Sequence, residues 1–153
     1  MIRVQAEPFQ PAAELAAFAR GRADVGGIAS FVGTVRNSQG GEPITALTLE
    51  HYPGMTERRL AALEAEACAR WPLLDSLIVH RVGRMRPAEA IVLVATASAH
   101  RAAALEACAF LIDRLKTEAP FWKLEETPAG ERWVEARAED DAAAARWRAA
   151  ETG

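Results

Sequence analysis

Apolar positions along the chain follow two spacings that replace one another in turn. Alternating or β-branched runs are typical of strands, and they cover residues 2–5, 28–36, 44–50, 76–80, 90–98, 124–127 and 132–136. Apolar residues that repeat with the 3.6-residue period of a helix cover residues 11–21, 56–70, 100–119 and 140–150. The pattern therefore predicts a mixed chain in which helices separate groups of strands.

The order of these segments predicts an α+β fold. Strands come mostly in pairs between helices, which favours a mostly antiparallel sheet covered by helices over a doubly wound parallel sheet. Residues 44–50 are expected to be the second arm of a hairpin that begins with residues 28–36. The polar residues 37–41 between them form either a plain turn or a mobile flap over a site. With 153 residues, the chain is expected to be one domain over residues 1–153.

Local features make these expectations specific. Gly33 lies inside a strand pattern, which predicts a bulge or a place where another group approaches the backbone. Thr56 is the expected N-cap of the second helix, and Asp140 or Asp141 that of the last. The apolar stripe of the second helix comprises Leu60, Leu63, Ala67 and Trp71. The seam by which the third helix packs on the sheet comprises Leu105, Cys108, Ile112 and Leu115.

Composition and charge narrow the classes of function. The net charge of -3 and the pI near 5.7 argue against a nucleic-acid or membrane surface, so an anion site requires a local basic cluster. The N-terminus lacks a secretory pattern and no apolar run approaches the length of a membrane span, so a soluble cytoplasmic protein is expected. Cys68 and Cys108 lie in alanine-rich helical patterns, which predicts reduced thiols packed in the core.

The stretch with the most chemistry surrounds Pro120. A proline crowds the preceding backbone out of the helical region, so Lys116 is expected in a last helical turn and Lys123 on the extended segment after the corner. Phe121 and Trp122 between them can wall off part of a cleft. An ammonium in such a cleft can act as an acid, a base or an anion clamp. The structural alternative is a surface lysine that complements the helix dipole.

Other basic residues also stand at the ends of predicted elements. Arg36 ends a strand, whereas His100 and Arg101 open a helix, where free backbone N–H groups favour an anion. Together with Lys116 and Lys123 they predict a pocket for an organic phosphate in an otherwise acidic protein. The three histidines are scattered and no Cys/His pair has ligand spacing, so neither a metal site nor another cofactor is predicted.

Several blocks in this order resemble the large, catalytic subunit of molybdopterin synthase, the MoaE family. The resemblance runs from about Gly26 to Trp147. Its blocks are Phe31-Val32-Gly33-Thr34-Val35-Arg36-Asn37, Glu50-His51-Tyr52-Pro53-Gly54-Met55, His80-Arg81-Val82-Gly83, Ser98-Ala99-His100-Arg101, Leu115-Lys116-Thr117, Ala119-Pro120-Phe121-Trp122-Lys123 and Arg132-Trp133-Val134-Glu135-Ala136. The resemblance implies an α/β hammerhead fold.

The resemblance also implies a sulfur transferase that converts cyclic pyranopterin monophosphate to molybdopterin by forming a dithiolene. The sulfur would arrive as the C-terminal thiocarboxylate of a small ubiquitin-like carrier with a Gly-Gly tail, and two catalytic subunits would form a homodimer with one carrier at each end. Lys116 would be the main catalytic lysine, with Lys123 beside it. The implied substrate site comprises Thr34, Val35, Arg36, His100, Arg101, Lys116, Lys123, Leu124 and Glu125.

Two departures from the family pattern and two rival functions remain. Leu124 replaces a residue that is often basic in the family, and Leu105 replaces an aromatic residue in what is expected to be a volume-conserving core exchange. One rival is a non-catalytic module that binds a ubiquitin-like partner or an organic phosphate. The other is an acyltransferase or phosphohydrolase that uses the same lysines. The sequence leaves open whether Lys116 is a nucleophile, a base or an acid.

Overall fold

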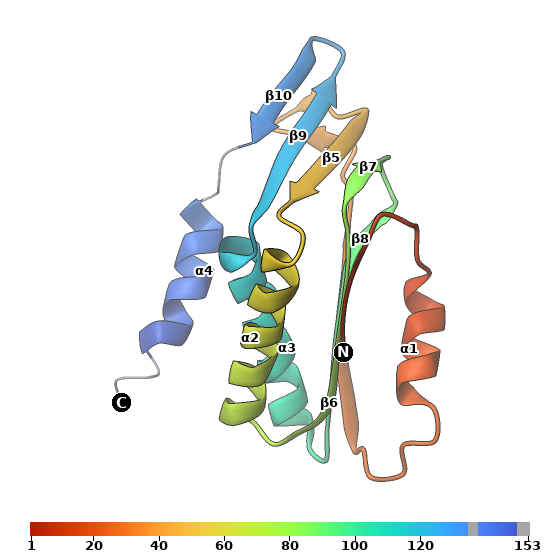
Figure 1. The fold of residues 1–153 in the computed structure, drawn as a ribbon, viewed down its shortest axis with the longest axis vertical. Helices are drawn as coiled ribbons and strands as arrows, with labels where there is room; N and C mark the ends of the chain where they lie inside the picture. The colour runs from red at the N-terminus through yellow and green to blue at the C-terminus, as the bar shows by residue number, and fades with distance from the viewer. Residues whose placement is uncertain (135–137, 150–153) are drawn as a thin grey trace.

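The computed structural model describes residues 1–134 and 138–149. Helices and strands are interleaved along the chain as the apolar pattern predicts (Figure 1). The elements are β1 (Ile2–Gln5), α1 (Pro11–Ala19), β2 (Gly27–Thr34), β3 (Ser38–Gln39), β4 (Glu42–Pro43), β5 (Ala46–His51), α2 (Met55–Arg70), β6 (Leu73–Arg81), β7 (Gly83–Met85), β8 (Ala90–Ser98), α3 (Arg101–Glu118), β9 (Phe121–Thr127), β10 (Gly130–Val134) and α4 (Ala138–Ala149).

The first sheet carries the main core. Its strands lie in the order β1-β6-β8-β2, with β1 parallel to β6 and the other pairs antiparallel. Helices α2 and α3 cover one face of this sheet, and α1 lies on the other (Figure 1). The larger cluster, between the sheet and α2 and α3, includes Leu60, Leu63, Ala67, Ile78, Val92, Val94, Phe110, Leu111 and Leu115. The α2 stripe is thus the predicted one, with Trp71 partly buried beside it.

The second sheet continues the molecule beyond the ends of α2 and α3. Its order is β10-β9-β5-β7, and all of its pairs are antiparallel. The α+β architecture with mostly antiparallel sheets is therefore confirmed, although its strands divide into two four-stranded sheets. Along the chain between β2 and β5, the short strands β3 and β4 form a two-stranded hairpin.

The hairpin predicted between residues 28–36 and 44–50 is wrong. Strand β2 pairs with β8, whereas β5 pairs with β7 and β9. The β3–β4 hairpin lies between them and carries the chain from one sheet to the other. Alternation of apolar residues shows which face of a strand is buried but not which strand lies beside it, so the sequence pattern did not identify the partner.

Most element boundaries agree with the pattern. The irregularity predicted at Gly33 is a register shift between Gly33 and Thr34. The penultimate strand begins at Phe121 rather than Leu124, and β3, β4 and β7 were too short to be predicted. Ala136 and Ala150, which end the last predicted strand and helix, lie outside the described residues.

Two predicted caps are wrong. Gly54 is the N-cap of α2, with φ of 84°, a conformation that glycine adopts without strain. The Glu57 carboxylate accepts a hydrogen bond from the Gly54 N–H at 2.6 Å, whereas Thr56 is buried and donates its hydroxyl to the Tyr52 carbonyl at 2.9 Å. Helix α4 begins at Ala138, so Asp140 and Asp141 lie within it.

Two predictions of burial on the helices are also wrong. The Leu105 side chain is 60% exposed, because α3 packs on the sheet mainly through its alanines, Cys108, Leu111 and Leu115. The exchange at Leu105 is therefore not a core exchange. Cys108 is buried, as predicted, but Cys68 is exposed, and both thiols are free. Burial raises the pKa of the Cys108 thiol to about 11. Within the described residues, no helix has the length and apolar composition needed to cross a bilayer.

Candidate functional site

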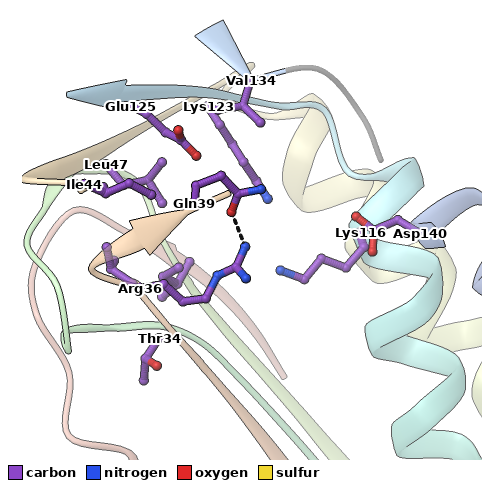
Figure 2. Close-up of a pocket in the computed structure, with 12 residues that line it drawn as sticks. Thr34, Arg36, Gln39, Ile44, Leu47, Lys116, Lys123, Glu125, Val134 and Asp140 are labelled. Carbon is purple, nitrogen blue, oxygen red and sulfur yellow. Dashed lines mark hydrogen bonds between the residues drawn. The ribbon is translucent and has the colours of Figure 1, made fainter. Parts of the chain in front are cut away.

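A cavity of about 300 Å³ lies where the second sheet meets the C-terminal end of α3. We call it the lysine cavity, because the amines of Lys116 and Lys123 and the guanidinium of Arg36 point into it (Figure 2). Its lining comprises Thr34, Val35, Arg36, Gln39, Ile44, Leu47, Ile91, Lys116, Lys123, Glu125, Val134 and Asp140. Both sheets and two helices therefore contribute to one concave polar site.

The Pro120 corner places the two lysines. Helix α3 ends at Glu118, Ala119 has an extended backbone, and β9 starts at Phe121. Lys116 lies in the last helical turn, as predicted from Pro120. Lys123 is the third residue of β9, where it pairs with Leu49 of β5 and Val134 of β10. The chain thus passes from helix to strand within two residues, and both amines reach the same cavity.

Arg36 comes from the other side of the cavity. It lies just after the end of β2, and its guanidinium donates a hydrogen bond to the side-chain oxygen of Gln39 on β3 (Figure 2). Thr34 and Val35 line the wall next to it. Residues 37–41, predicted as a turn or a flap, thus belong to a short hairpin that holds Arg36 at the rim.

The acidic lining residue Glu125 already has a partner. Its side chain is 5% exposed and forms an ion pair with Arg132 at 3.0 Å, and Arg132 also contacts Glu42 at 2.6 Å. The charge of Glu125 is therefore largely balanced outside the cluster of Arg36 and the lysines. Leu124 is not among the residues that line the cavity, as expected for a neighbour that points to the opposite face of the strand.

His100 and Arg101 do not join the cavity within one copy of the chain. Both are exposed at the N-terminal end of α3. Arg101 precedes Lys116 by 15 positions, which at the rise of an α-helix corresponds to about 22 Å. Of the five basic residues expected to converge, the structure brings together Arg36, Lys116 and Lys123.

A histidine that the sequence pattern does not point to lies beside these amines. His80, near the end of β6, lines a smaller cavity of about 50 Å³ together with Lys116, Lys123 and Phe121. We call this space the histidine cavity. Burial lowers the pKa of His80 to about 3, and the positive charges of Lys116 and Lys123 act in the same direction. His80 is therefore a neutral imidazole in a positively charged site.

The scarcity of lysine in the sequence is a signal that points to this site. Among 18 basic residues the whole sequence has only two lysines, and both line the lysine cavity. Arginine serves every other basic position, so the site holds the only two side-chain amines of the chain. Arginine stays protonated in proteins, whereas lysine can lose its proton, which points to proton transfer or nucleophilic chemistry here. Within the described residues, no group of three or more His, Cys, Asp or Glu could hold a metal ion.

The chain is similar to one family throughout most of its length. The family model described as "MoaE protein" matches residues 4–118. A molybdopterin synthase catalytic subunit of Ralstonia nicotianae is 53% identical over 95% of this chain and 83% of its own length. One of Pseudomonas aeruginosa is also 53% identical, over 95% of this chain and 97% of its own.

Solved structures agree with the sequence comparison. A molybdopterin biosynthesis MoaE protein from Burkholderia ambifaria has a TM-score of 0.81 and 54% identity, covering 96% of this chain and 97% of its own. Molybdopterin synthase from Staphylococcus aureus has a TM-score of 0.80 and 32% identity, covering 87% and 96%. The fold also recurs, at 19% identity and a TM-score of 0.76, in a complex of subunits 1 and 2 of molybdopterin-converting factor from Helicobacter pylori, which covers 89% and 91%.

Proposed function

The chain belongs to the MoaE family, and from this premise we propose that its chemistry takes place in the lysine cavity. It is a molybdopterin synthase catalytic subunit, a sulfur transferase that converts cyclic pyranopterin monophosphate to molybdopterin. Its partner is the small subunit of the synthase, which in our proposal delivers sulfur as a C-terminal thiocarboxylate. In this proposal, residues in or beside the cavity carry out each step of the reaction.

The observation that carries the proposal is the convergence of both lysines with Arg36. The substrate has a phosphate, and the planar guanidinium of Arg36 can bind two phosphate oxygens at once. Thr34 and Val35 form the wall beside it. The phosphate would therefore lie at the Arg36 rim, and the pterin carbons that receive sulfur would face the lysines.

In this proposal, Lys116 and Lys123 assist the making and breaking of bonds in the reaction. The thiocarboxylate sulfur attacks a substrate carbon and displaces an oxygen from it, as water or as the phosphate oxygen freed when the cyclic phosphate opens. The carrier is then joined to the new C–S bond through its acyl group. Water then cleaves the acyl–sulfur bond, returning a carboxylate on the carrier and leaving sulfur on the pterin. Both this cleavage and the opening of the cyclic phosphate develop negative oxygen, which ammonium groups stabilise and protonate. Because like charges disfavour a second ammonium, one amine can act as the base that activates water.

We assign His100 and Arg101 to the site of a second copy. Strand β2 is at the edge of the first sheet, and its Ile28, Phe31 and Val32 are exposed apolar residues. An exposed apolar edge favours strand pairing with a partner. In an antiparallel twofold pairing of β2, the start of one strand lies opposite the end of the other. The start of β2 is packed against Arg101, so Arg101 of one copy would approach Thr34 and Arg36 of the other.

The remaining substrate contacts and the cellular setting agree with the same arrangement. Glu125 lines the cavity and forms an ion pair with Arg132, and Leu124 would contribute through the β9 backbone rather than through its side chain. The apolar lining formed by Ile44, Leu47 and Val134 suits the entry of a Gly-Gly tail, which has no side chains.

A carrier of this kind and a free pterin are both water-soluble, so we place the reaction in the cytoplasm.

The proposal is tested by replacing Lys116 in a reaction that contains cyclic substrate and thiocarboxylated carrier. Lys116→Ala is expected to reduce dithiolene formation by about 10²- to 10⁴-fold, the usual contribution of a positioned proton-transfer group. Its melting temperature and its complex with the carrier should be unchanged. Lys116→Arg keeps the positive charge but cannot transfer a proton, so it should be equally impaired. Full activity of Lys116→Ala would remove the lysine cavity from the mechanism, and carrier binding without any conversion by the wild-type chain would indicate a binding module.

A further inference from the structure

His80 occupies a position that the proposed chemistry has not used. It lies two residues after Ile78 on β6, and alternate residues of a strand share a face, so it continues the face that packs on α2 and α3. Its neighbours along this face are apolar, yet the side chain is polar and 4% exposed. A buried imidazole in such a place requires partners for both of its nitrogens.

The proton position on the ring is fixed by the backbone. Nδ1 lies 2.9 Å from the Arg81 carbonyl oxygen, and a carbonyl only accepts hydrogen bonds, so Nδ1 carries the proton. The pKa near 3 means that the ring is neutral at physiological pH. A neutral imidazole protonated on Nδ1 has a lone pair on Nε2. His80 is thus an acceptor of fixed tautomer.

The ring is also fixed in orientation. Phe121 stacks on it with ring centroids 4.0 Å apart and an interplanar angle of 16°. Phe121 is the first residue of β9, directly after the corner that separates the two lysines. His80 and both lysines line the histidine cavity, and of the two amines Lys116 has the stronger electrostatic effect on His80. The ring is therefore held firmly beside the C-terminal end of α3.

We propose that His80 is a positioning residue of the lysine cavity, whose Nε2 accepts a hydrogen bond from the ammonium group of Lys116 and holds that amine in place for the reaction. The inference rests on the proposed function for its catalytic consequence, but the hydrogen bond itself is independent of it. A neutral acceptor is suited to this task. A carboxylate in its place would form an ion pair and keep the lysine permanently protonated, whereas imidazole positions the amine and still allows it to release a proton.

The charged groups around the ring determine the sign of the expected titration effect. The charged groups are Lys116 on α3 and Lys123 on β9; His51 on β5 is a further titratable group, and the Arg81 carbonyl on β6 is a neutral hydrogen-bond partner. A lone pair that accepts from an ammonium stabilises the charged form of the lysine. Removal of Nε2 should therefore lower the pKa of Lys116, whether this lysine acts as an acid or as a base.

The low number of lysines makes the pKa of Lys116 directly measurable. Protein labelled with ¹³C at lysine Cε gives NMR signals from only two residues, and Lys123→Arg assigns them. In His80→Phe, which keeps a stacked ring, the Lys116 titration should move down by about one to two pH units, the equivalent of a hydrogen bond to a charged group. In His80→Gln, whose side-chain oxygen can take the place of Nε2, it should stay near the wild-type value. His51→Phe, which changes the other imidazole next to Phe121, is the matched control and should also leave it in place.

Activity provides the second measurement. His80→Phe should lower kcat by roughly 10- to 100-fold with little change in KM, and the limb of the pH profile that depends on Lys116 should move to lower pH. His80→Gln should recover most of kcat. If His80→Phe fails to fold, His80→Asn replaces it, because its shorter amide reaches only the Nδ1 position. An unchanged Lys116 titration in His80→Phe, or in His80→Asn where His80→Phe does not fold, would overturn the inference, as would a His80→Gln as impaired as His80→Phe. A fully active Lys116→Ala would instead contradict the proposed function and leave the titration result intact.

Discussion

The two ends of α3 carry similar basic residues but have different surroundings. At the C-terminal end, the helix gives way at Pro120 to β9, which brings Lys123 to the cavity that Lys116 lines. At the N-terminal end, Gly26 packs so closely that a Cβ there would lie 1.9 Å from the Ala99 oxygen. Backbone thus fills the space at that end, and His100 and Arg101 remain exposed. A basic residue at a helix end forms a site only when other elements enclose it.

The first prediction tests the helix that joins the two ends. Phe110, in the middle of α3, is fully buried against Trp71 and Trp147. Phe110→Ala should cost about 3–5 kcal/mol of unfolding free energy, because it removes buried apolar area and leaves a cavity. Chemical denaturation measures this cost, and the exposed Arg20→Ala is the control. The activity of the remaining folded protein should be near wild type, whereas a matching loss of kcat would mean that the middle of α3 also shapes the site.

The second prediction asks whether the ends of two different copies form one site. Arg101→Ala should lower activity by about 10²- to 10³-fold, as loss of a charge-stabilising group does, and Lys116→Ala by about 10²- to 10⁴-fold, as loss of a proton-transfer group does. Dimers that contain one copy of each variant have one intact site, so a mixed and re-equilibrated sample should recover about a quarter of wild-type activity. Mixing without any recovery would place Arg101 outside the partner's cavity.

The third prediction concerns the rim opposite α3. Arg36→Ala should raise KM for the cyclic substrate by about 10- to 30-fold with a smaller effect on kcat, because the guanidinium contacts phosphate in the ground state as well as in the transition state. Arg84→Ala is a matched control, since Arg84 is exposed on β7 and pairs with Glu126 at 2.8 Å. Equal effects of the two substitutions would mean that general positive charge, rather than Arg36, attracts the substrate.

The fourth prediction concerns how the C-terminal half of α3 is anchored. Partial burial opposes ionisation of Glu66 on α2, but hydrogen bonds from Arg114 and Arg70 outweigh it and lower the pKa of Glu66 below 4.5. A lowered carboxylate pKa adds stability above the ordinary pKa, and this is lost as the pH falls through the folded-state value. Denaturation below about pH 4.5 should show a loss of about 1 kcal/mol that is absent in Glu66→Gln. The same pH dependence in both proteins would assign the loss to other carboxylates.

Much of the fold can be predicted from the sequence because apolar periodicity reports the local buried face. It placed α1, α2, α3 and the long strands, but it could not show that residues 44–50 pair with β7 and β9. Alternation carries no information on the partner strand. The prediction that Leu105 is buried was wrong for a related reason. The alanines of α3 allow close packing on the sheet, so the larger leucine is left outside the contact.

The sequence predicted the part of the site that local chain geometry determines, and it did not predict the parts that depend on distant segments. The proline corner was enough to place Lys116 and Lys123 together. The length of α3 sets the distance of Arg101 from the two lysines. The motifs that carry the family resemblance contain no information on this distance. His80 was named only within a family block and among the histidines excluded as metal ligands, because its proposed role depends on Phe121 stacking on it from a strand 41 positions further along the chain. Such a contact exists only in the folded molecule.

The Pro120 corner has a consequence for how the site assembles. Lys116 and Lys123 are neighbours along the chain, so they can come together as soon as a short segment folds, with little loop entropy to overcome. Arg36 must be brought in from a segment 80 positions earlier, after both sheets have formed. A partial opening at the β3–β4 hairpin would therefore remove the guanidinium that we propose to bind phosphate, while the two amines stay together. Substrate affinity should then be more sensitive than amine reactivity to heat and denaturant.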